Sequence, residues 1–400
     1  MKILVVSLLR LGDIIQQIPL LQGLRAKYPE AQIHLYANKQ FSQVEALLAG
    51  IVDRYIYLDR EALQKGMGEA EYNILWSFKE LEKQIKQLNQ ENYTLALNFT
   101  HNKLSAYLLG VIQADVKKGL HQIDGRFAGL ENPWLRYFND RFSASQKSQF
   151  HYVELLAKSF DLDVPRKTST ARPRSKLILM QCLTSDTKKN WGLQNFAQLK
   201  KTIEESLVDY EVCVLGAPFE HDQLAGVFGE SDLLICDLFE AKKHLEGAAL
   251  LISGDTSIKH LAAQNGTPIV EISLGSADVA KTGAYTEAVK TIVSDAACAP
   301  CNHSQACSQK SQVCAENISV DHVFAAVWDQ LSGQAGKNKA TKHELEKAVW
   351  SLYLDKKKNL VEPSFIEATH AFYTKYADVD RKSTRLNSSH TDISRMPSSA

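Results

Sequence analysis

The sequence predicts an α/β protein of two domains, each built on a doubly wound parallel sheet. The chain has 400 residues, which is too many for one hydrophobic core. Short apolar runs alternate with longer segments of helical periodicity, as expected for parallel strands joined by helical crossovers. The polar, basic segment 166–176 interrupts this alternation. We interpret it as a linker between an N-terminal domain, residues 1–165, and a C-terminal domain, residues 177–331.

The N-terminal domain opens with an apolar run that is typical of a buried parallel strand. A helix is expected over Ile14–Lys27, and Pro19 should kink this helix or mark its true start. Strands are expected over Lys2–Leu8, Gln32–Ala37, Tyr55–Leu58 and Thr94–Asn98. Further helices are expected over Ser42–Leu48, Ile74–Asn89 and Lys103–Leu109.

The C-terminal domain repeats the pattern, with a helix over Phe196–Glu205. Its strands are expected over Leu177–Gln181, Glu211–Leu215, Leu233–Cys236, Ala248–Ile252 and Thr267–Ile272. Residues 332–380 are interpreted as a helical extension, with a helix over Lys342–Leu354. Residues 381–400 are serine-rich and aperiodic, and we interpret them as a non-native tail that resembles translated sequencing adapter.

Composition excludes several functional classes. Lysine plus arginine equals aspartate plus glutamate, 46 each, so no overall charge favours binding to nucleic acid. No apolar run approaches the ~20 residues that span a bilayer, and no G-x-G-x-x-G dinucleotide signature follows the first strand. The N-terminus lacks a cleavage site typical of a signal peptide, so we expect a cytoplasmic protein with reduced thiols.

The segment Ser253–Glu271 predicts a strand–helix–strand unit whose helix starts where a strand ends. Gly266 should end the helix. Three adjacent residues could cap its N-terminus, Asp255, Thr256 and Ser257. The free N–H groups at such a helix start suit a phosphate, and Lys259 and His260 could add donors. The alternative is an ordinary capped helix in a parallel sheet.

Two loops that follow strands also carry polar candidates. Thr184, Ser185 and Lys189 follow the first strand of the C-terminal domain, and hydroxyls with a lysine suit a diphosphate. A solvated polar turn is the alternative, and Lys188 is interpreted as a surface residue. Glu220 follows another strand and could accept hydrogen bonds from two vicinal hydroxyls, or could simply be an exposed turn residue.

Asp13 lies in the loop after the first strand, in the sequence Arg10-Leu11-Gly12-Asp13. A carboxylate in this place can take a proton from a substrate hydroxyl. It can equally cap the helix that follows. The residues alone leave both roles open.

Four cysteines fall within a short segment, in the spacing C-x2-C-x5-C-x6-C. They are Cys298, Cys301, Cys307 and Cys314. Such a cluster in a reduced protein indicates a structural zinc site. Labile disulfides and free thiols are the alternatives.

Together these segments resemble the signatures of glycosyltransferase family 9, the bacterial lipopolysaccharide heptosyltransferases. The matching residues are Arg10, Gly12, Asp13 and Pro19, the segment Thr184–Trp191, Gly216 with Glu220, the segment Asp255–Pro268 and, more weakly, Asp278–Gly283. The chain departs from the family at Ser257, where a glycine is usual, and at Ser7 and Leu9, where a basic and a small polar residue are usual.

The resemblance implies the GT-B architecture, in which two Rossmann-like domains face each other across a cleft. It implies that Asp13 is the general base of an inverting transfer, with Arg10 and Gly12 in a substrate loop. Donor contacts are implied for Thr184, Ser185, Lys189, Glu220, Asp255, Thr256, Ser257 and His260.

The resemblance also implies the substrates. The donor would be a sugar nucleotide, ADP-heptose, and the acceptor a lipid-linked saccharide of the lipopolysaccharide inner core at the inner membrane surface. Catalysis would require no cofactor, and the protein would be cytoplasmic, with peripheral contact to that membrane. Two alternatives are a non-catalytic nucleotide- or metal-binding protein on the same scaffold, favoured by Ser257, and a retaining or epimerising GT-B enzyme, whose acidic motifs are lacking.

Overall fold

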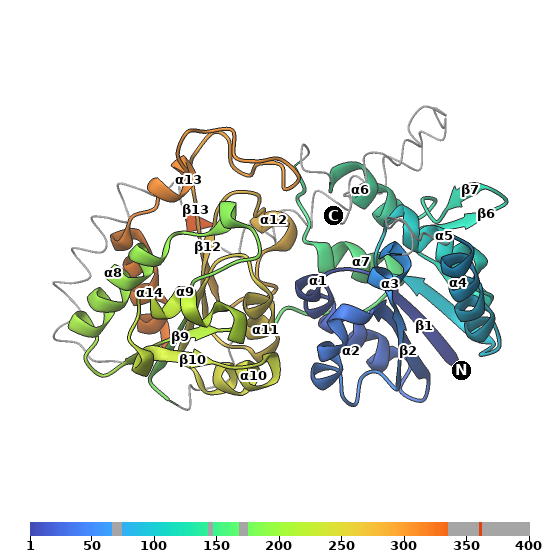
Figure 1. Ribbon diagram of the computed structural model, residues 1–400, viewed down its shortest axis with the longest axis horizontal. Coiled ribbons are helices and arrows are strands. Elements are labelled where there is room, and N and C mark those ends of the chain that lie inside the picture. Colours follow the sequence, from blue (N-terminus) through green and yellow to red (C-terminus); the bar gives the residue numbers. More distant parts are fainter. Residues whose placement is uncertain (66–73, 143–146, 168–174, 335–359, 362–400) are drawn as a thin grey trace. The chain divides into compact units, whose positions relative to one another are not determined.

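The computed structural model describes residues 1–65, 74–142, 147–167, 175–334 and 360–361 (Figure 1). Its described residues form two compact units. Of the described residues, those up to Ser148 and from Tyr152 to Val164 belong to the first unit, and 149–151 and those from Pro165 to Val361 belong to the second. Each unit has a parallel sheet with helices between its strands, so the predicted α/β class with two Rossmann-like sheets is confirmed.

The first unit is organised around a five-stranded parallel sheet in the order β3-β2-β1-β4-β5. The strands are β1 (Lys2–Ser7), β2 (Gln32–Asn38), β3 (Arg54–Leu58), β4 (Tyr93–Asn98) and β5 (Ala114–Lys118). The strand order reverses between β1 and β4. Open α/β sheets bind ligands at the carboxyl ends of the strands that flank such a reversal.

Helices and a small hairpin complete the first unit. They are α1 (Leu11–Gln16), α2 (Ile18–Lys27), the 3₁₀ segment η1 (Lys39–Leu47), α3 (Arg60–Lys65), α4 (Ile74–Asn89), α5 (Lys103–Val111), α6 (Pro133–Arg141), α7 (Tyr152–Phe160), and the hairpin β6 (His121–Ile123) with β7 (Arg126–Ala128). The single helix predicted around Pro19 is two helices. Pro19 lies in the first turn of α2, where its fixed φ and missing N–H are tolerated.

The second unit has a seven-stranded sheet in the order β10-β9-β8-β11-β12-β13-β14. Its strands are β8 (Leu177–Gln181), β9 (Glu211–Gly216), β10 (Leu233–Ile235), β11 (Leu250–Ser253), β12 (Ile269–Ser273), β13 (Val289–Val293) and β14 (Leu360–Val361). All pairs are parallel except β13 with β14. Here the strand order reverses between β8 and β11, which marks the expected ligand site of this unit.

The helical segments of the second unit alternate with these strands. They are η2 (Thr187–Lys189), α8 (Leu193–Ser206), η3 (Pro218–Glu220), α9 (His221–Ala225), η4 (Glu230–Asp232), α10 (Leu238–Gly247), α11 (Ser257–Asn265), α12 (Val279–Thr282), α13 (Val313–Glu316) and α14 (Val320–Gln334). Strand β11 is buried along its whole length, as expected for a central strand covered on both faces.

Some predicted segments lie outside the described residues. These are 168–174 of the linker, most of the extension 332–380 with its helix Lys342–Leu354, and the tail 381–400. Among the residues that are described, no helix combines the length and the apolar character that crossing a membrane requires.

Candidate active site

The helix α11 begins at the carboxyl end of β11, as the sequence predicts. Of the three candidate caps, Thr256 takes the position, and its Oγ1 accepts a hydrogen bond from the Lys259 N–H at 3.3 Å. Asp255 precedes the cap and Ser257 is the first helical residue. Gly266 ends the helix with φ of 73°, a left-handed conformation that suits glycine. The helix start therefore presents its free N–H groups at the β8–β11 strand reversal.

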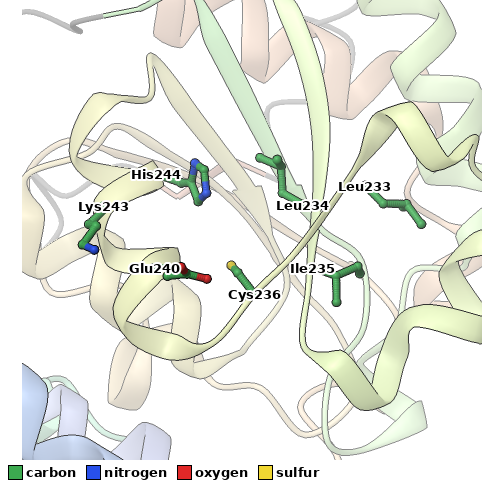
Figure 2. Close-up of a pocket in the computed structure, with 7 residues that line it drawn as sticks. All are labelled: Leu233, Leu234, Ile235, Cys236, Glu240, Lys243 and His244. Atoms are coloured by element: carbon green, nitrogen blue, oxygen red, sulfur yellow. The ribbon is translucent and has the colours of Figure 1, made fainter.

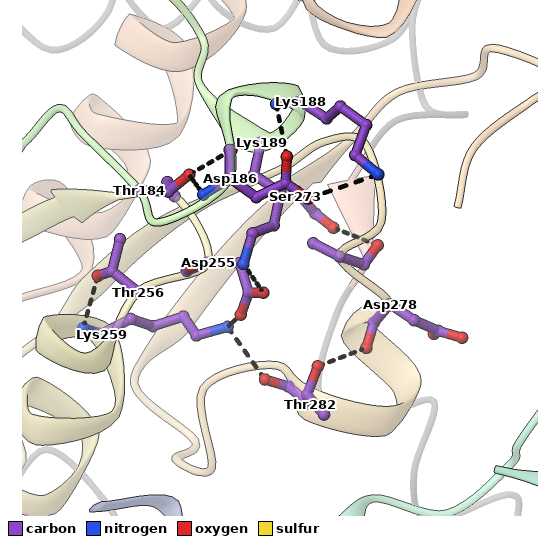
Figure 3. A network of polar contacts seen from close by, with 12 residues as sticks. Thr184, Asp186, Lys188, Lys189, Asp255, Thr256, Lys259, Ser273, Asp278 and Thr282 are labelled. Carbon is purple, nitrogen blue, oxygen red and sulfur yellow. Dashed lines mark hydrogen bonds and ion pairs between the residues drawn. The ribbon is translucent and has the colours of Figure 1, made fainter. Parts of the chain in front are cut away.

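The Asp255 carboxylate holds two lysine side chains at this helix start (Figure 3). Its Oδ1 lies 2.7 Å from Lys259 Nζ, and its Oδ2 lies 3.0 Å from Lys189 Nζ. Burial alone would raise the pKa of the Asp255 carboxyl, but the two ammonium groups hold this pKa well below its ordinary value. Asp255 therefore stays ionised and joins the loop after β8 to the loop after β11.

Lys259 is a buried cation, and its exposed fraction is 1%. Its Nζ also lies 2.7 Å from Glu271 Oε1 and donates to the Thr282 carbonyl at 3.0 Å. Burial alone would lower the pKa of Lys259, but the carboxylates of Asp255 and Glu271 raise it above its ordinary value. The expectation that Lys259 adds a donor for a ligand is therefore wrong, because all three of its ammonium hydrogens have partners in the protein.

Sequence reasoning overlooked Glu271, although the sequence held a signal. Glu271 is the only charged residue of β12, a strand that is otherwise apolar or small, and its exposed fraction is 1%. Its second carboxylate oxygen accepts from the Ala284 N–H at 3.0 Å. A charge in a buried strand requires a cation beside it, and Lys259 is that cation.

His260 has a ring nitrogen with no partner among the described residues. The side chain is buried, with 6% exposed, and its Nδ1 makes no hydrogen bond. Burial, together with the charge of Lys259, lowers the pKa of His260 to about 3. The imidazole is therefore neutral near pH 7, and a buried polar atom left unpaired is costly unless a ligand or water completes it.

The turn after β8 carries the other predicted residues. Thr184 builds this turn, because its N–H donates to Asn190 Oδ1 at 2.9 Å and its Oγ1 donates to the Asp186 carbonyl at 2.7 Å. Ser185 is exposed beside it. Since β8 and β11 are neighbours in the sheet, this turn and the start of α11 flank one site, and the Lys189–Asp255 ion pair spans it.

Glu220 follows β9, the next strand beyond β8. Its Oε2 accepts a hydrogen bond from the Ala217 N–H at 2.8 Å, so the carboxylate stabilises its own turn. A contact to vicinal hydroxyls of a ligand remains a prediction for this residue.

Arg10, Gly12 and Asp13 lie in the first unit, at the start of α1 after β1. Arg10 occupies the N-cap position without a capping side-chain bond, and Asp13 lies within the first turn. The alternative in which Asp13 is the N-cap residue is therefore wrong. A carboxylate in the first turn is favoured by the helix dipole.

A buried polar group lies close to Asp13. Burial raises the pKa of the Tyr152 hydroxyl, and the negative charge of Asp13 adds to this shift. That hydroxyl donates to the Phe99 carbonyl at 2.7 Å and accepts from Gln17 Nε2. Gln17 in turn accepts from Ser7 Oγ at 2.6 Å, so these hydrogen bonds join the segments that carry β1, α1 and α7.

The four cysteines of the predicted zinc segment line one small cavity of about 70 Å³. Cys314 is buried, Cys298 and Cys301 are half-buried, and Cys307 is exposed. All of them are free thiols, so the disulfide alternative is not realised in this structure. Within the described residues, no three histidine, cysteine or carboxylate side chains are arranged to hold a metal ion. A zinc site here would require the thiols to move closer together.

The zinc hypothesis drawn from the sequence predicts about one zinc ion per chain in protein purified without chelator, because four thiolates can complete a tetrahedral site once they move together. Elemental analysis checks this. Changing both Cys298 and Cys301 to serine should remove the metal, whereas Cys236→Ser, outside the segment, should not. A zinc content below about 0.1 equivalent in the parent protein would contradict the prediction.

A larger cavity of about 330 Å³ lies elsewhere in the second unit (Figure 2). Its walls come from β10 and α10, with Cys236, Glu240 and His244 among the polar side chains. None of the residues at the β8–β11 reversal lines it. The charged groups and the helix N-terminus that suit a phosphate therefore lie outside this cavity, at the β8–β11 reversal.

Comparisons with known proteins identify the family and the fold of this chain. A model of glycosyltransferase family 9 (heptosyltransferase) matches residues 81–312. No match by sequence is found among curated proteins. A structure of Escherichia coli heptosyltransferase WaaC with ADP-2-deoxy-2-fluoro heptose is 18% identical, with a TM-score of 0.58, and the match covers 82% of this chain and 99% of that chain.

Two further structures share the fold. A family 9 glycosyl transferase from Veillonella parvula is 16% identical, with a TM-score of 0.59, over 83% of this chain and 97% of that chain. The E. coli ADP-heptose lps heptosyltransferase II is 15% identical, with a TM-score of 0.54, over 84% of this chain and 99% of that chain. These likenesses show the GT-B fold class that the sequence predicts.

Proposed function

This chain belongs to glycosyltransferase family 9, the heptosyltransferases, and on that premise we propose that it is an inverting transferase that moves a heptose from ADP-heptose to a saccharide acceptor. The observation that supports a nucleotide-diphosphate donor most strongly is the junction of two loops at the β8–β11 reversal. There, Lys189 meets Asp255 at 3.0 Å directly before the N-terminus of α11. A cation next to free helix N–H groups suits the two phosphates of such a donor.

The proposed reaction forms one glycosidic bond and breaks one bond to phosphate. The acceptor hydroxyl gives its proton to the Asp13 carboxylate, and its oxygen attacks the anomeric carbon on the face opposite the diphosphate. The bond between that carbon and the phosphate oxygen breaks, and its electron pair leaves with ADP. Lys189 and the α11 N-terminus would stabilise the charge that develops on the leaving diphosphate, a role that a divalent ion plays in other transferases.

The remaining donor residues would have separate roles. The neutral His260 could donate or accept one hydrogen bond with its unpaired Nδ1, and Thr256 and Ser257 would direct backbone N–H groups at the phosphates. Thr184 and Ser185 would offer groups from the turn after β8. The Glu220 carboxylate would exchange its hydrogen bond from the Ala217 N–H for hydrogen bonds from the ribose hydroxyls.

We propose a lipid-linked saccharide of the lipopolysaccharide inner core as the acceptor, reached at the cytoplasmic face of the inner membrane. Family membership and the heptosyltransferase structures of similar fold support this choice. A transfer assay with ADP-heptose and a lipid-linked core acceptor tests it. Formation of ADP without a glycosylated product would mean that water takes the heptose and that this saccharide is not the acceptor. Failure to bind ADP at all would contradict the proposal.

Lys189→Ala should weaken ADP binding by about 10- to 150-fold, because one charged hydrogen-bond donor is worth about 1.5–3 kcal/mol. Titration calorimetry measures the dissociation constant. Lys201→Ala is the matched control, because Lys201 makes only a loose, exposed ion pair with Glu205 at 3.9 Å on α8. Equal ADP affinity in Lys189→Ala and the parent would remove Lys189 from the donor site.

A further inference from the structure

Lys188 was expected on the surface, but its ammonium group is held by the protein. Its side chain is 13% exposed. Its Nζ donates to three backbone carbonyls, those of Asn302 at 3.1 Å, His303 at 3.2 Å and Gln305 at 2.5 Å. An ammonium group has three hydrogens, so these carbonyls satisfy it completely. All three acceptors lie between Cys301 and Cys307, within residues 298–314, which we call the cysteine loop.

The same loop also binds the backbone of the turn that carries Lys189. Gln312 Nε2 donates to the Lys188 carbonyl at 2.7 Å and to the Asn190 carbonyl at 3.0 Å. These two carbonyls flank Lys189 on either side. One side chain of the cysteine loop therefore fixes the backbone from which Lys189 extends.

Three further contacts restrict the turn. Gly275, with φ of 59°, packs so closely that a Cβ atom there would lie 2.3 Å from the Lys188 carbonyl oxygen. The Gly275 carbonyl accepts from the Cys301 N–H at 2.8 Å. The Trp191 indole donates to the Ile318 carbonyl at 2.8 Å, just beyond the loop. The turn, the segment around Gly275 and the cysteine loop are therefore in mutual contact.

Neighbouring lysines of the turn consequently have different partners. Lys188 extends to the cysteine loop. Lys189 extends instead to Asp255 at the start of α11, as Figure 3 shows. The side chain that is proposed to meet the donor therefore stands on a backbone held from the other side by Lys188 and Gln312. A charged group held in place before binding loses less entropy when the ligand arrives.

We propose that the cysteine loop positions Lys189 for the sugar nucleotide, and that Lys188 and Gln312 are the positioning residues through which it acts. This inference rests on the proposed function, because it assumes that the donor diphosphate binds Lys189. Neither residue touches the donor in this proposal. Their contribution is to the affinity for the nucleotide, through the placement of the turn.

The test measures ADP affinity by calorimetry in Gln312→Ala and Lys188→Met. Each variant should bind ADP at least about fivefold more weakly than the parent, the effect of losing about 1 kcal/mol of hydrogen bonding. The KM for the donor should rise similarly, and kcat should fall to the extent that Lys189 stabilises the leaving diphosphate, whereas the KM for the acceptor should stay near the parent value. A residue with only a general structural role would not produce that separation.

Two variants in the same loop serve as matched controls. Gln309→Ala removes a glutamine whose amide reaches, among the residues that the structure describes, only Ser308 Oγ, at 3.5 Å. Gln305→Ala leaves the backbone carbonyl that Lys188 uses. Both should bind ADP like the parent.

The outcomes separate this inference from the proposed function. If the parent binds ADP and Lys189→Ala weakens binding, but Gln312→Ala and Lys188→Met bind like the parent, the positioning role is wrong and the donor site stands. The same conclusion follows if the two variants melt at a lower temperature yet keep parental ADP affinity. If the parent itself does not bind ADP, both the site and the positioning role are wrong.

Discussion

Asp13→Asn should lower kcat for sugar transfer by about 10²- to 10⁴-fold, the usual contribution of general-base catalysis. Asparagine matches aspartate in size but cannot accept a proton near neutral pH. The first turn of α1 should persist, because Arg10 and not Asp13 occupies its N-cap position. ADP affinity should be unchanged, since the proposed donor contacts lie in the second unit. The decisive measurement is kcat, taken together with ADP affinity and thermal melting.

Asp161→Asn provides the matched control for Asp13→Asn. Asp161 also lies in the first unit, its side chain is 90% exposed, and it pairs with Lys27 on the surface. Its backbone has φ of 55°, which asparagine tolerates as well as aspartate does. This variant should transfer sugar at the parental rate. A parental kcat in Asp13→Asn, in folded protein, would leave the proposed mechanism without its base.

Lys259→Met should destabilise the second unit by about 3–5 kcal/mol, the cost of breaking a buried ion pair from one side. Methionine fills much of the space of the lysine stem but leaves Glu271 buried without its cation, and leaves Asp255 with Lys189 alone. The loss of free energy of unfolding should appear as a lower urea midpoint for this unit. It should far exceed the effect at an exposed pair.

Two further variants test whether the loss of stability comes from the buried charge. Lys176→Met removes the exposed pair with Asp209, whose side chains are 60% and 72% accessible, and should cost at most about 1 kcal/mol. Adding Glu271→Gln to Lys259→Met removes the unpaired carboxylate and keeps an acceptor for Ala284, so stability should partly return. An urea midpoint for Lys259→Met equal to that of Lys176→Met would show that the buried network contributes little.

Strong local signals in the sequence predicted the elements that carry the proposed site. The start and end of α11 could be predicted from an N-cap candidate and from Gly266, because capping depends on residues a few positions apart. The structure shows the positive φ that such a glycine adopts. The strands β8, β9, β11 and β12 were visible as apolar runs because both faces of a central parallel strand are buried. The order of these strands, which places Lys189 near Asp255, requires the tertiary structure.

Other elements carried weak signals. The strand β5 reads Ala-Asp-Val-Lys-Lys and lies at the edge of its sheet, so none of its residues is buried and it has no clear apolar pattern. The hairpin β6–β7 has strands of three residues each, too short for a period to be recognised. The helix expected over Ser42–Leu48 is the 3₁₀ segment η1, interrupted by non-helical angles at Phe41.

The roles of the lysines were the least predictable part of the site. Lys188 and Lys189 are adjacent in an irregular turn, where no period shows which side chain extends toward which neighbour. Their partners, the loop carbonyls and Asp255, are more than 60 residues away in sequence. Lys259 lies four residues after Asp255, and this spacing on a helix favours an ion pair. Lys259 is also paired with Glu271 and so is not available to a ligand. Glu271 lies on β12, so helical spacing cannot reveal this pair.

The shared carboxylate of Asp255 bears on how a nucleotide can enter this site. Two ammonium groups and two carboxylates, on Lys189, Lys259, Asp255 and Glu271, balance one another before any ligand arrives. When a phosphate draws Lys189 away, Asp255 keeps Lys259 as its counter-ion, so the exchange leaves no buried carboxylate unpaired. A single small anion would have to break the ion pair between Lys189 and Asp255 and would gain only its own contact with Lys189. A ligand that also reached the helix N-terminus and His260 would gain several contacts for the same exchange, so the proposed site would discriminate by the number of contacts rather than by charge alone.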